Sequence, residues 1–196
     1  IASNTIQAIP ADAGANVAIV RADDDRSVGI FSITGNILGS RDRNIYVRNA
    51  RSSMTIGSNV IYTGVDANVV LEQCANIVMS GNTFRPSGLF GPNFQDRCGI
   101  RLDDCSRCSI NGNIILGPGD GGPDSGGAIS LRRSSSTAIL GNQMMHTPYR
   151  GVYLEDCRQC RVAMNTILPP EDGTAFQAEV TEAGQCEMNH ISGNTF

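Results

Sequence analysis

The sequence predicts an all-β protein that folds as a parallel β-helix, a solenoid of about seven stacked coils. Glycine accounts for 22 of 196 residues and aromatic residues for only 5%. Because glycine costs a helix about 1 kcal/mol per site, this composition disfavours a helical bundle. The chain also repeats itself at a minimum interval of 23 residues. Within each repeat, apolar and polar residues alternate with a period of two, which is typical of strands.

The repeat is clearest in four segments that align without gaps, at residues 68–85, 99–116, 128–145 and 151–168. Each contains a leucine, with cysteine or serine three residues later and asparagine eleven residues later. The leucines are Leu71, Leu102, Leu131 and Leu154, and the asparagines are Asn82, Asn113, Asn142 and Asn165. Looser copies end at Asn36, Asn59 and Asn194, so successive asparagines are separated by 23, 23, 31, 29, 23 and 29 residues. A constant unit with additions in one place predicts a solenoid with loops on one edge.

Each coil is predicted to contain three short strands. In the best-preserved copy, Ile100 and Leu102 alternate with polar residues in the first strand, and Ile110 lies in the second. We predict a tight turn after the second strand, at residues 80–82, 111–113 and 140–142. Each of these segments contains Gly-Asn, and glycine and asparagine tolerate the left-handed backbone of such a turn. A short third strand comes next, and the variable loops at residues 85–98, 116–127, 146–150 and 169–175 lead back to the first strand. We expect residues 1–20 to add a partial coil through Ile6, Ile9, Val17 and Ile19.

The pattern apolar-x-Leu…Asn-x-x-Ile-x-x-x-Gly-Asn-x-Ile, over about residues 28–196, resembles the repeat of the pectate-lyase-like parallel β-helix superfamily. The resemblance implies a single-stranded right-handed parallel β-helix with a carbohydrate-binding groove along its first strands. That superfamily includes lyases, hydrolases, transferases, epimerases and phage tailspikes, so the resemblance does not select a reaction. It implies a secreted protein or one at a cell or virion surface. In its lyases an arginine acts as the base and acidic side chains hold Ca²⁺, which makes Ca²⁺ the cofactor to consider.

The outward positions of the first strands supply the candidate site residues. We predict catalytic roles for Asp103, Arg132 and Glu155, which are expected to lie on three consecutive coils. The two carboxylates would then lie ~9.6 Å apart along the axis, near the ~6.5–9.5 Å separation of inverting glycosidases. The predicted substrate-binding residues are Arg101, Tyr153, Asp104, Arg133, Asp156, His146, Tyr149 and Arg150. No metal ligand is assigned.

A structural interpretation of the same residues stays open. Acid, base and acid on successive coils would place opposite charges across from one another, as in an ion-pair ladder that only supports the fold. Other candidates also have ordinary explanations. Asp120 and Asp124 lie in a glycine-rich loop without the spacing of an EF-hand, the acidic run at residues 23–25 is typical of a solvated turn, and His190 is expected to be structural.

The cysteines form two Cys-x-x-Cys pairs, Cys105/Cys108 and Cys157/Cys160, which could indicate zinc. The repeat favours a different interpretation, because the first cysteine of each pair occupies the position of Ser134 and would be a small inward residue. A disulfide between adjacent coils, Cys74 with Cys105 or Cys157 with Cys186, is a third alternative, since adjacent coils bring Cα atoms within disulfide range.

Two function classes remain. The chain is a polysaccharide-processing protein, as a lyase, hydrolase or transferase, or a non-catalytic β-helix that binds glycan or serves as a spacer, as in a phage fibre. A net charge of −4 argues against nucleic acid as a partner, and no apolar run long enough to span a membrane is present. We expect residues 1–196 to be one β-helix domain within a longer β-helix, because the last coil would leave Ile191 and Phe196 uncovered. Further sequence beyond Phe196 or a homo-oligomer contact would cover them.

Overall fold

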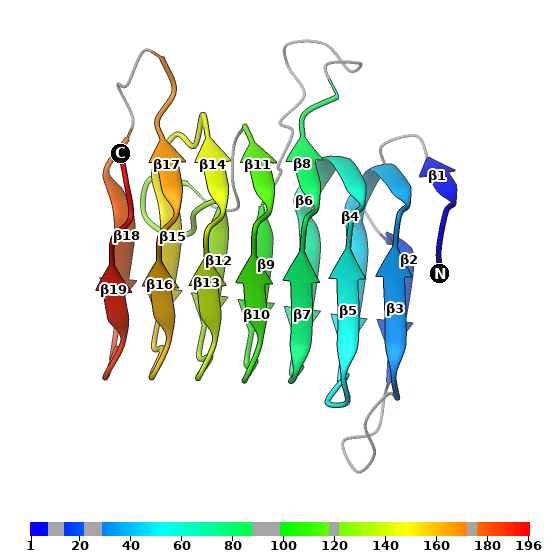
Figure 1. The fold of residues 1–196 in the computed structure, drawn as a ribbon, viewed down its shortest axis with the longest axis horizontal. Coiled ribbons are helices and arrows are strands. Elements are labelled where there is room, and N and C mark those ends of the chain that lie inside the picture. Colours follow the sequence, from blue (N-terminus) through cyan, green and yellow to red (C-terminus); the bar gives the residue numbers. More distant parts are fainter. Residues whose placement is uncertain (8–13, 22–28, 88–98, 118–121, 172–175) are drawn as a thin grey trace.

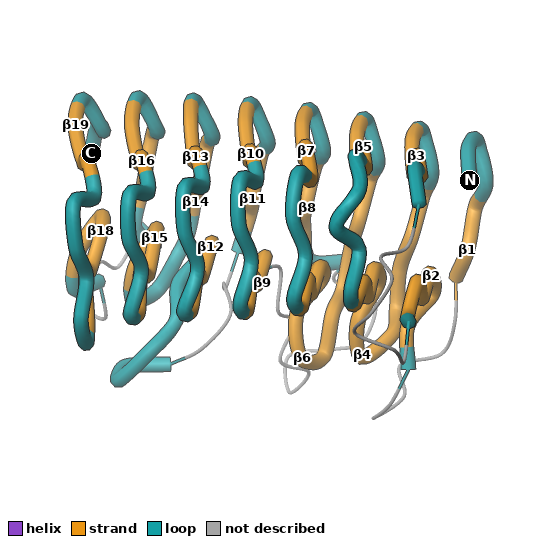
Figure 2. Tube along the Cα trace, turned by 90° about the horizontal axis from the view of Figure 1, so that it is seen from below, coloured by secondary structure: helices purple, strands orange, loops and turns teal. Residues whose placement is uncertain are grey.

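The computed structural model describes residues 1–7, 14–21, 29–87, 99–117, 122–171 and 176–196. These residues form parallel strands stacked into coils, as Figures 1 and 2 show. The strands are β1 (Thr5–Gln7), β2 (Ala15–Val20), β3 (Phe31–Thr34), β4 (Ile37–Arg48), β5 (Met54–Gly57), β6 (Val60–Glu72), β7 (Ile77–Ser80), β8 (Thr83–Arg85), β9 (Ile100–Asp103), β10 (Ser109–Asn111), β11 (Ile114–Leu116), β12 (Ile129–Arg132), β13 (Ala138–Leu140), β14 (Gln143–Met145), β15 (Arg150–Glu155), β16 (Arg161–Ala163), β17 (Thr166–Leu168), β18 (Ala178–Ala183) and β19 (His190–Ser192). The predicted all-β parallel β-helix is therefore confirmed.

Three faces surround the core. The first face consists of β2, the ends of β4 and β6, then β9, β12, β15 and β18. The second face runs β3-β5-β7-β10-β13-β16-β19. The third face consists of β1, the beginnings of β4 and β6, then β8, β11, β14 and β17. Strands from successive coils pair in register, so equivalent residues of the repeat form columns along the axis (Figure 2).

Two coils differ from the prediction of three short strands. In these coils the third and first strands are fused into β4, with 12 residues, and β6, with 13 residues. A register shift between Arg41 and Arg43 bends the pair, and Thr63 within β6 adopts a left-handed φ of 53°. Because of the bend, each long strand begins in the third face and ends in the first face. In these two coils the repeat has its minimum length and no loop is inserted.

The core contains the predicted inward columns. Leu71, Leu102, Leu131 and Leu154 are fully buried and lie side by side in the first face. In the last coil this column continues with Glu182, which is exposed. At that end Ile191 and Phe196 are 41% and 68% exposed, and the Phe176 and Phe196 rings lie 5.5 Å apart.

The asparagines form a continuous ladder at the tight turn between the second and third faces. In each coil the backbone N–H and the side-chain amide of one asparagine donate to Oδ1 of the next, at 2.9–3.0 Å between Asn82 and Asn113. The ladder also includes Asn4, which the sequence interpretation missed. β1 and β2 pair with β4, as expected for a partial coil in residues 1–20, although Ile9 lies outside the described residues. Gly81, Gly112 and Gly141 have φ near +60°, the left-handed conformation that the turn requires.

The cysteines of the described residues are free thiols. Cys74, Cys105 and Cys157 are buried and donate to main-chain carbonyls of the preceding coil. The interpretation of these cysteines as small inward residues is confirmed, and no disulfide joins Cys74 to Cys105 or Cys157 to Cys186. Cys98 lies outside the described residues.

Candidate functional site

A polar hollow of about 340 Å³ lies over the ends of the first-face strands β4, β6, β9 and β12. We call it the first hollow. Its lining residues are Arg48, Glu72, Gln73, Asp103, Asp104, Arg132 and Arg133. Four of the residues predicted for the site therefore meet there, namely Asp103, Asp104, Arg132 and Arg133.

The register of the strands sets the order of charges in the first hollow. Arg48 pairs with Glu72, Glu72 with Asp103, and Asp103 with Arg132. Two carboxylates therefore extend from the same face of adjacent strands, whose backbones are ~4.8 Å apart. Glu155 follows Arg132 in the same column but is not part of the lining. The adjacent acid pair is Glu72 and Asp103, whereas the sequence interpretation paired Asp103 with Glu155.

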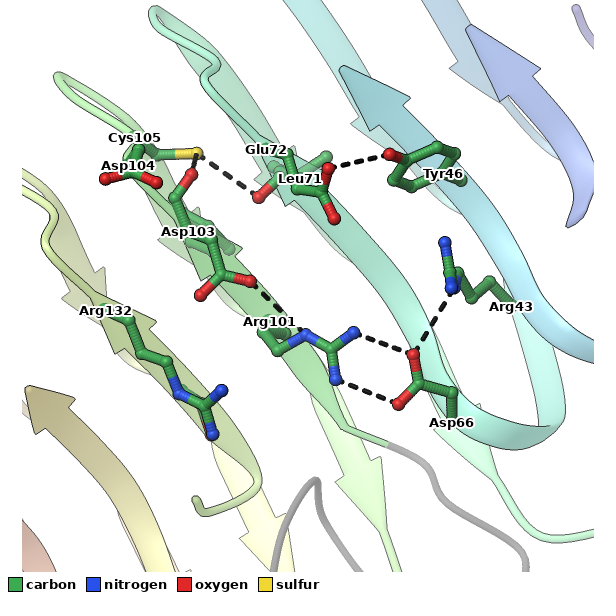
Figure 3. Close-up of polar contacts among 12 residues, drawn as sticks. Arg43, Tyr46, Asp66, Leu71, Glu72, Arg101, Asp103, Asp104, Cys105 and Arg132 are labelled. Carbon is green, nitrogen blue, oxygen red and sulfur yellow. Dashed lines mark hydrogen bonds and ion pairs between the residues drawn. The ribbon is translucent and has the colours of Figure 1, made fainter. Parts of the chain in front are cut away.

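The environment of Asp103 shifts the pKa of its carboxyl group upward. Burial raises the pKa of Asp103 above its ordinary value, and the negative charge of Glu72 adds to this rise. The guanidinium groups of Arg101, Arg132 and Arg133 oppose it. Glu72 accepts a 2.7 Å hydrogen bond from the Tyr46 hydroxyl (Figure 3). A carboxyl group with a raised pKa and a second one that accepts a hydrogen bond are thus neighbours.

The arginines near the first hollow differ in how far their charges are already paired. Arg101 binds both oxygens of Asp66, at 2.9 and 2.7 Å, and its Nε lies 3.4 Å from Asp103 (Figure 3). Arg133 binds both oxygens of Asp104, at 2.9 and 3.0 Å. These two side chains are held in bidentate pairs.

Arg132 and Arg48 keep donors available. Among the described residues, the ion pair of Arg132 runs from Nε to Glu155 at 3.4 Å, and its terminal nitrogens contact no acceptor. Arg48 is exposed and makes no side-chain hydrogen bond or ion pair within the described ranges. The first hollow therefore has an adjacent carboxylate pair with a guanidinium group on either side.

Arg150 and Tyr153 support a loop at a distance from the first hollow. Arg150 is 8% exposed and donates to the carbonyl oxygens of Gly122, Gly126 and Pro123, at 3.1, 3.4 and 2.6 Å. Its guanidinium carbon lies 5.6 Å from the centre of the Tyr153 ring, and Tyr153 is only 5% exposed. Their contacts in this structure hold the loop against β15.

The remaining predicted residues also lie outside the first hollow. His146 is exposed at the end of β14, and Tyr149 is half-buried before β15. Asp156 is exposed and accepts a 2.8 Å hydrogen bond from the backbone of Gln185. Asp124 is exposed, while Asp120 and the acidic run at residues 23–25 lie outside the described residues.

Sequence reasoning missed Glu72, Arg48 and Gln73 as site residues. Their positions in the outward columns were readable from the repeat. The signal that could have found them is the like-charged neighbour: Glu72 directly opposite Asp103 breaks the alternation of an ion-pair ladder. Like charges directly opposite each other destabilise a sheet, so such a pair marks a candidate functional site.

Comparison with known proteins assigns the family. The profile of the family described as "Periplasmic copper-binding protein (NosD)" matches residues 21–196. The chain belongs to the NosD family. The family description places these proteins in the periplasm, in agreement with a location outside the cytoplasm. No curated protein matches this NosD-family chain, and the described residues contain no helix long and apolar enough to cross a membrane.

Solved structures share the fold of this NosD-family chain at low sequence identity. The enzymatically active domain of tailspike protein 2 from bacteriophage CBA120 matches 83% of the chain with a TM-score of 0.61 and 11% identity. The A-module of the mannuronan C-5 epimerase AlgE4 from Azotobacter vinelandii matches 85% at TM-score 0.55 and 16% identity. The periplasmic alginate epimerase AlgG matches 85% at TM-score 0.51 and 12% identity. The matches cover 24%, 51% and 46% of those three chains, respectively.

The side chains that the structure describes do not fit a copper site. No three His, Cys, Asp or Glu side chains within the described ranges gather into a group that could hold a metal ion. In each Cys-x-x-Cys pair a hydrogen bond between the two thiols raises the pKa of the first cysteine, Cys105 or Cys157, and lowers that of the second, Cys108 or Cys160. The chemistry derived for these residues therefore involves no copper.

Proposed function

We propose that the first hollow binds a glycan and that Glu72 and Asp103 cleave a glycosidic bond there. The observation that carries the proposal is the pair of carboxyl groups on adjacent strands, set between Arg48 and Arg132. Asp103, with its raised pKa, would protonate the leaving oxygen, and Glu72 would attack the anomeric carbon. Water would then hydrolyse the glycosyl–Glu72 ester, with Asp103 accepting the proton of the water.

The spacing of the strands that carry the acid pair supports one of the two hydrolytic geometries. Side chains on adjacent strands start ~4.8 Å apart, close to the ~5–5.5 Å carboxyl separation of retaining enzymes. The wider spacing of Asp103 and Glu155 would have favoured inversion. The proposal is therefore hydrolysis with retention of the anomeric configuration.

The guanidinium groups of Arg48 and Arg132 support an acidic glycan as the substrate. Arginine donors recognise carboxylates well, and the terminal nitrogens of Arg132 have no acceptor within the described ranges. Two structures with the same fold are named for mannuronan and alginate epimerases. Both polymers carry a carboxylate on every sugar, so polyuronates are the first substrates to test.

The test is product formation on a panel of polysaccharides by the wild-type chain and by two variants, Glu72→Gln and Asp103→Asn. New reducing ends would report hydrolysis, and ultraviolet absorbance of unsaturated sugars would report elimination. We expect reducing ends from at least one acidic polymer and a loss of a hundredfold or more in either variant. The matched control is Glu171→Gln, because Glu171 is exposed and lies outside the first hollow. Activity that persists in both variants would refute the catalytic assignment.

Glycan binding without catalysis is the second candidate function, and the bidentate pairs favour it. Arg133 with Asp104 and Arg101 with Asp66 hold four charged side chains in fixed positions, as a static binding surface would. Calorimetric titration with the same oligosaccharides separates the two functions. Binding without any product would support the second and overturn the first.

A further inference from the structure

A second hollow adjoins the first at the turn between the first and second faces. Its volume is about 470 Å³. Its lining residues are Arg51, Gln73, Cys74, Ala75, Asp104, Ser106 and Arg107. Gln73 and Asp104 line both hollows, so the two are contiguous across the turn.

The second hollow carries an excess of positive charge, although the whole chain has a net charge of −4. Its one carboxylate, Asp104, is already neutralised by the bidentate pair with Arg133. Arg51 and Arg107 are exposed. Arg107 donates from Nε to Asn76 at 3.0 Å, which leaves its charge uncompensated, and Arg51 makes no side-chain hydrogen bond or ion pair with the described residues. The first hollow, in contrast, is lined by three arginines and three carboxylates.

The residues at the boundary of the two hollows are set by the backbone. Gln73 and Asp104 both have a φ of 54°, the left-handed conformation that turns the chain from the first face to the second. The Oε1 atom of Gln73 is buried and has no hydrogen-bond donor among the described residues. A buried amide oxygen without a donor is costly, which makes Gln73 an energetically unfavourable point at the boundary of the two hollows.

We propose that the second hollow binds an anionic substituent, a carboxylate or a sulfate, of the same glycan that occupies the first hollow. This inference rests on the proposed function and adds the path that the glycan takes across the surface. The glycan crosses the turn from the first face toward the second, with one anionic group near Arg51 and Arg107. Arginine recognises both kinds of anion through paired N–H donors.

The experiment compares short and long oligosaccharides by isothermal titration calorimetry. The probes are mannuronate oligomers of two and six sugars, a sulfated oligosaccharide of six sugars and a neutral one of the same length. The variants are Arg51→Ala, Arg107→Ala and the double variant. Arg161→Ala is the matched control, because Arg161 is an exposed arginine on β16 and lines neither hollow. Circular dichroism establishes that each variant is folded.

We expect the double variant to bind the acidic hexamer at least tenfold more weakly and with less salt dependence than the wild type. The acidic dimer, which fits in the first hollow alone, should keep its affinity, and the control should match the wild type with every probe. If binding of the mannuronate hexamer depends on Arg51 and Arg107, the substituent is a carboxylate. If binding of the sulfated hexamer depends on them, it is a sulfate. Binding of both acidic hexamers that is unchanged in the double variant would overturn the second hollow as an anion site while leaving the first intact. No binding of any probe to the wild type would overturn both proposals.

Discussion

Replacing Asn113 with alanine tests whether the asparagine ladder stabilises the coils. Asn113 is fully buried, and its Oδ1 accepts hydrogen bonds from the backbone N–H and the side-chain amide of Asn82, at 3.0 and 2.9 Å. Its own amide donates to Oδ1 of Asn142 at 3.0 Å and to the carbonyl of Met79 at 3.1 Å. The substitution therefore removes contacts with the coils on both sides.

The magnitude follows from the groups left without partners. The side-chain amide of Asn82 keeps its 2.9 Å bond to the carbonyl of Ile56, but the buried N–H of Asn82 has no other acceptor. A buried donor left without an acceptor lowers the free energy of unfolding by about 1–3 kcal/mol, and each further hydrogen bond that is lost lowers it by about 0.5–1.5 kcal/mol. Three further bonds are lost, so we expect Asn113→Ala to lower the free energy of unfolding by at least about 2.5 kcal/mol.

The assay is urea unfolding followed by circular dichroism and by fluorescence of the tyrosines, since two probes reveal any loss of cooperativity in a repeat protein. Asn111→Ala is the matched control, because Asn111 lies in the same turn and is only half-buried. The Oδ1 atom of Asn111 accepts a 2.6 Å hydrogen bond from the Ser109 hydroxyl, and this bond is partly exposed to water. We expect the control to lose less than about 1 kcal/mol. Equal losses in the two variants would refute the role assigned to the ladder.

Three further predictions concern packing, charge and pH. Gly151→Ala should lower stability by about 1–3 kcal/mol in thermal melts, because the added Cβ would lie 2.6 Å from Ile167 Cγ2 and 2.8 Å from the Glu179 carbonyl oxygen. The control Gly122→Ala should change stability little, because there is open space around Gly122. Arg150→Ala should lower the free energy of unfolding in urea by about 2–4 kcal/mol, since this buried guanidinium donates to three carbonyl oxygens. Arg133→Ala should lower it by less than about 1 kcal/mol, because the ion pair of Arg133 is exposed. Comparable losses in the two variants would contradict this distinction. Because the folded-state pKa of Asp103 is raised, the folded state binds this proton more tightly than the unfolded state. The stability of the wild type relative to Asp103→Asn should therefore rise as the pH falls through that pKa, measured by urea unfolding across the pH range. Parallel pH profiles of the two proteins would contradict this expectation.

Much of the fold was predictable from the sequence because a solenoid repeats one local solution. Each coil must place an apolar residue inward at the same position, so Leu71, Leu102 and Leu131 recur with the same neighbours. The tight turn needs a left-handed residue, which explains the Gly-Asn pairs. Asn4 escaped detection because a single asparagine outside a recognisable copy carries no periodic signal, yet it continues the ladder. The fusion of strands in β4 and β6 was likewise hidden, since alternation does not show where a strand bends.

The repeat is sufficient to show which side chains point outward in the first face, and therefore that Asp103, Arg132 and Glu155 share a column. Which of these charges are paired and which are covered becomes visible only in the folded structure. Tyr153 occupies an outward position but is buried, and the guanidinium of Arg150 lies over its ring at 5.6 Å. Glu72 and Asp103 are 31 residues apart in the sequence but directly opposite each other across adjacent strands. The physical reason is that the repeat fixes the direction of a side chain, whereas the loops and long-range partners fix its exposure and its electrostatic environment.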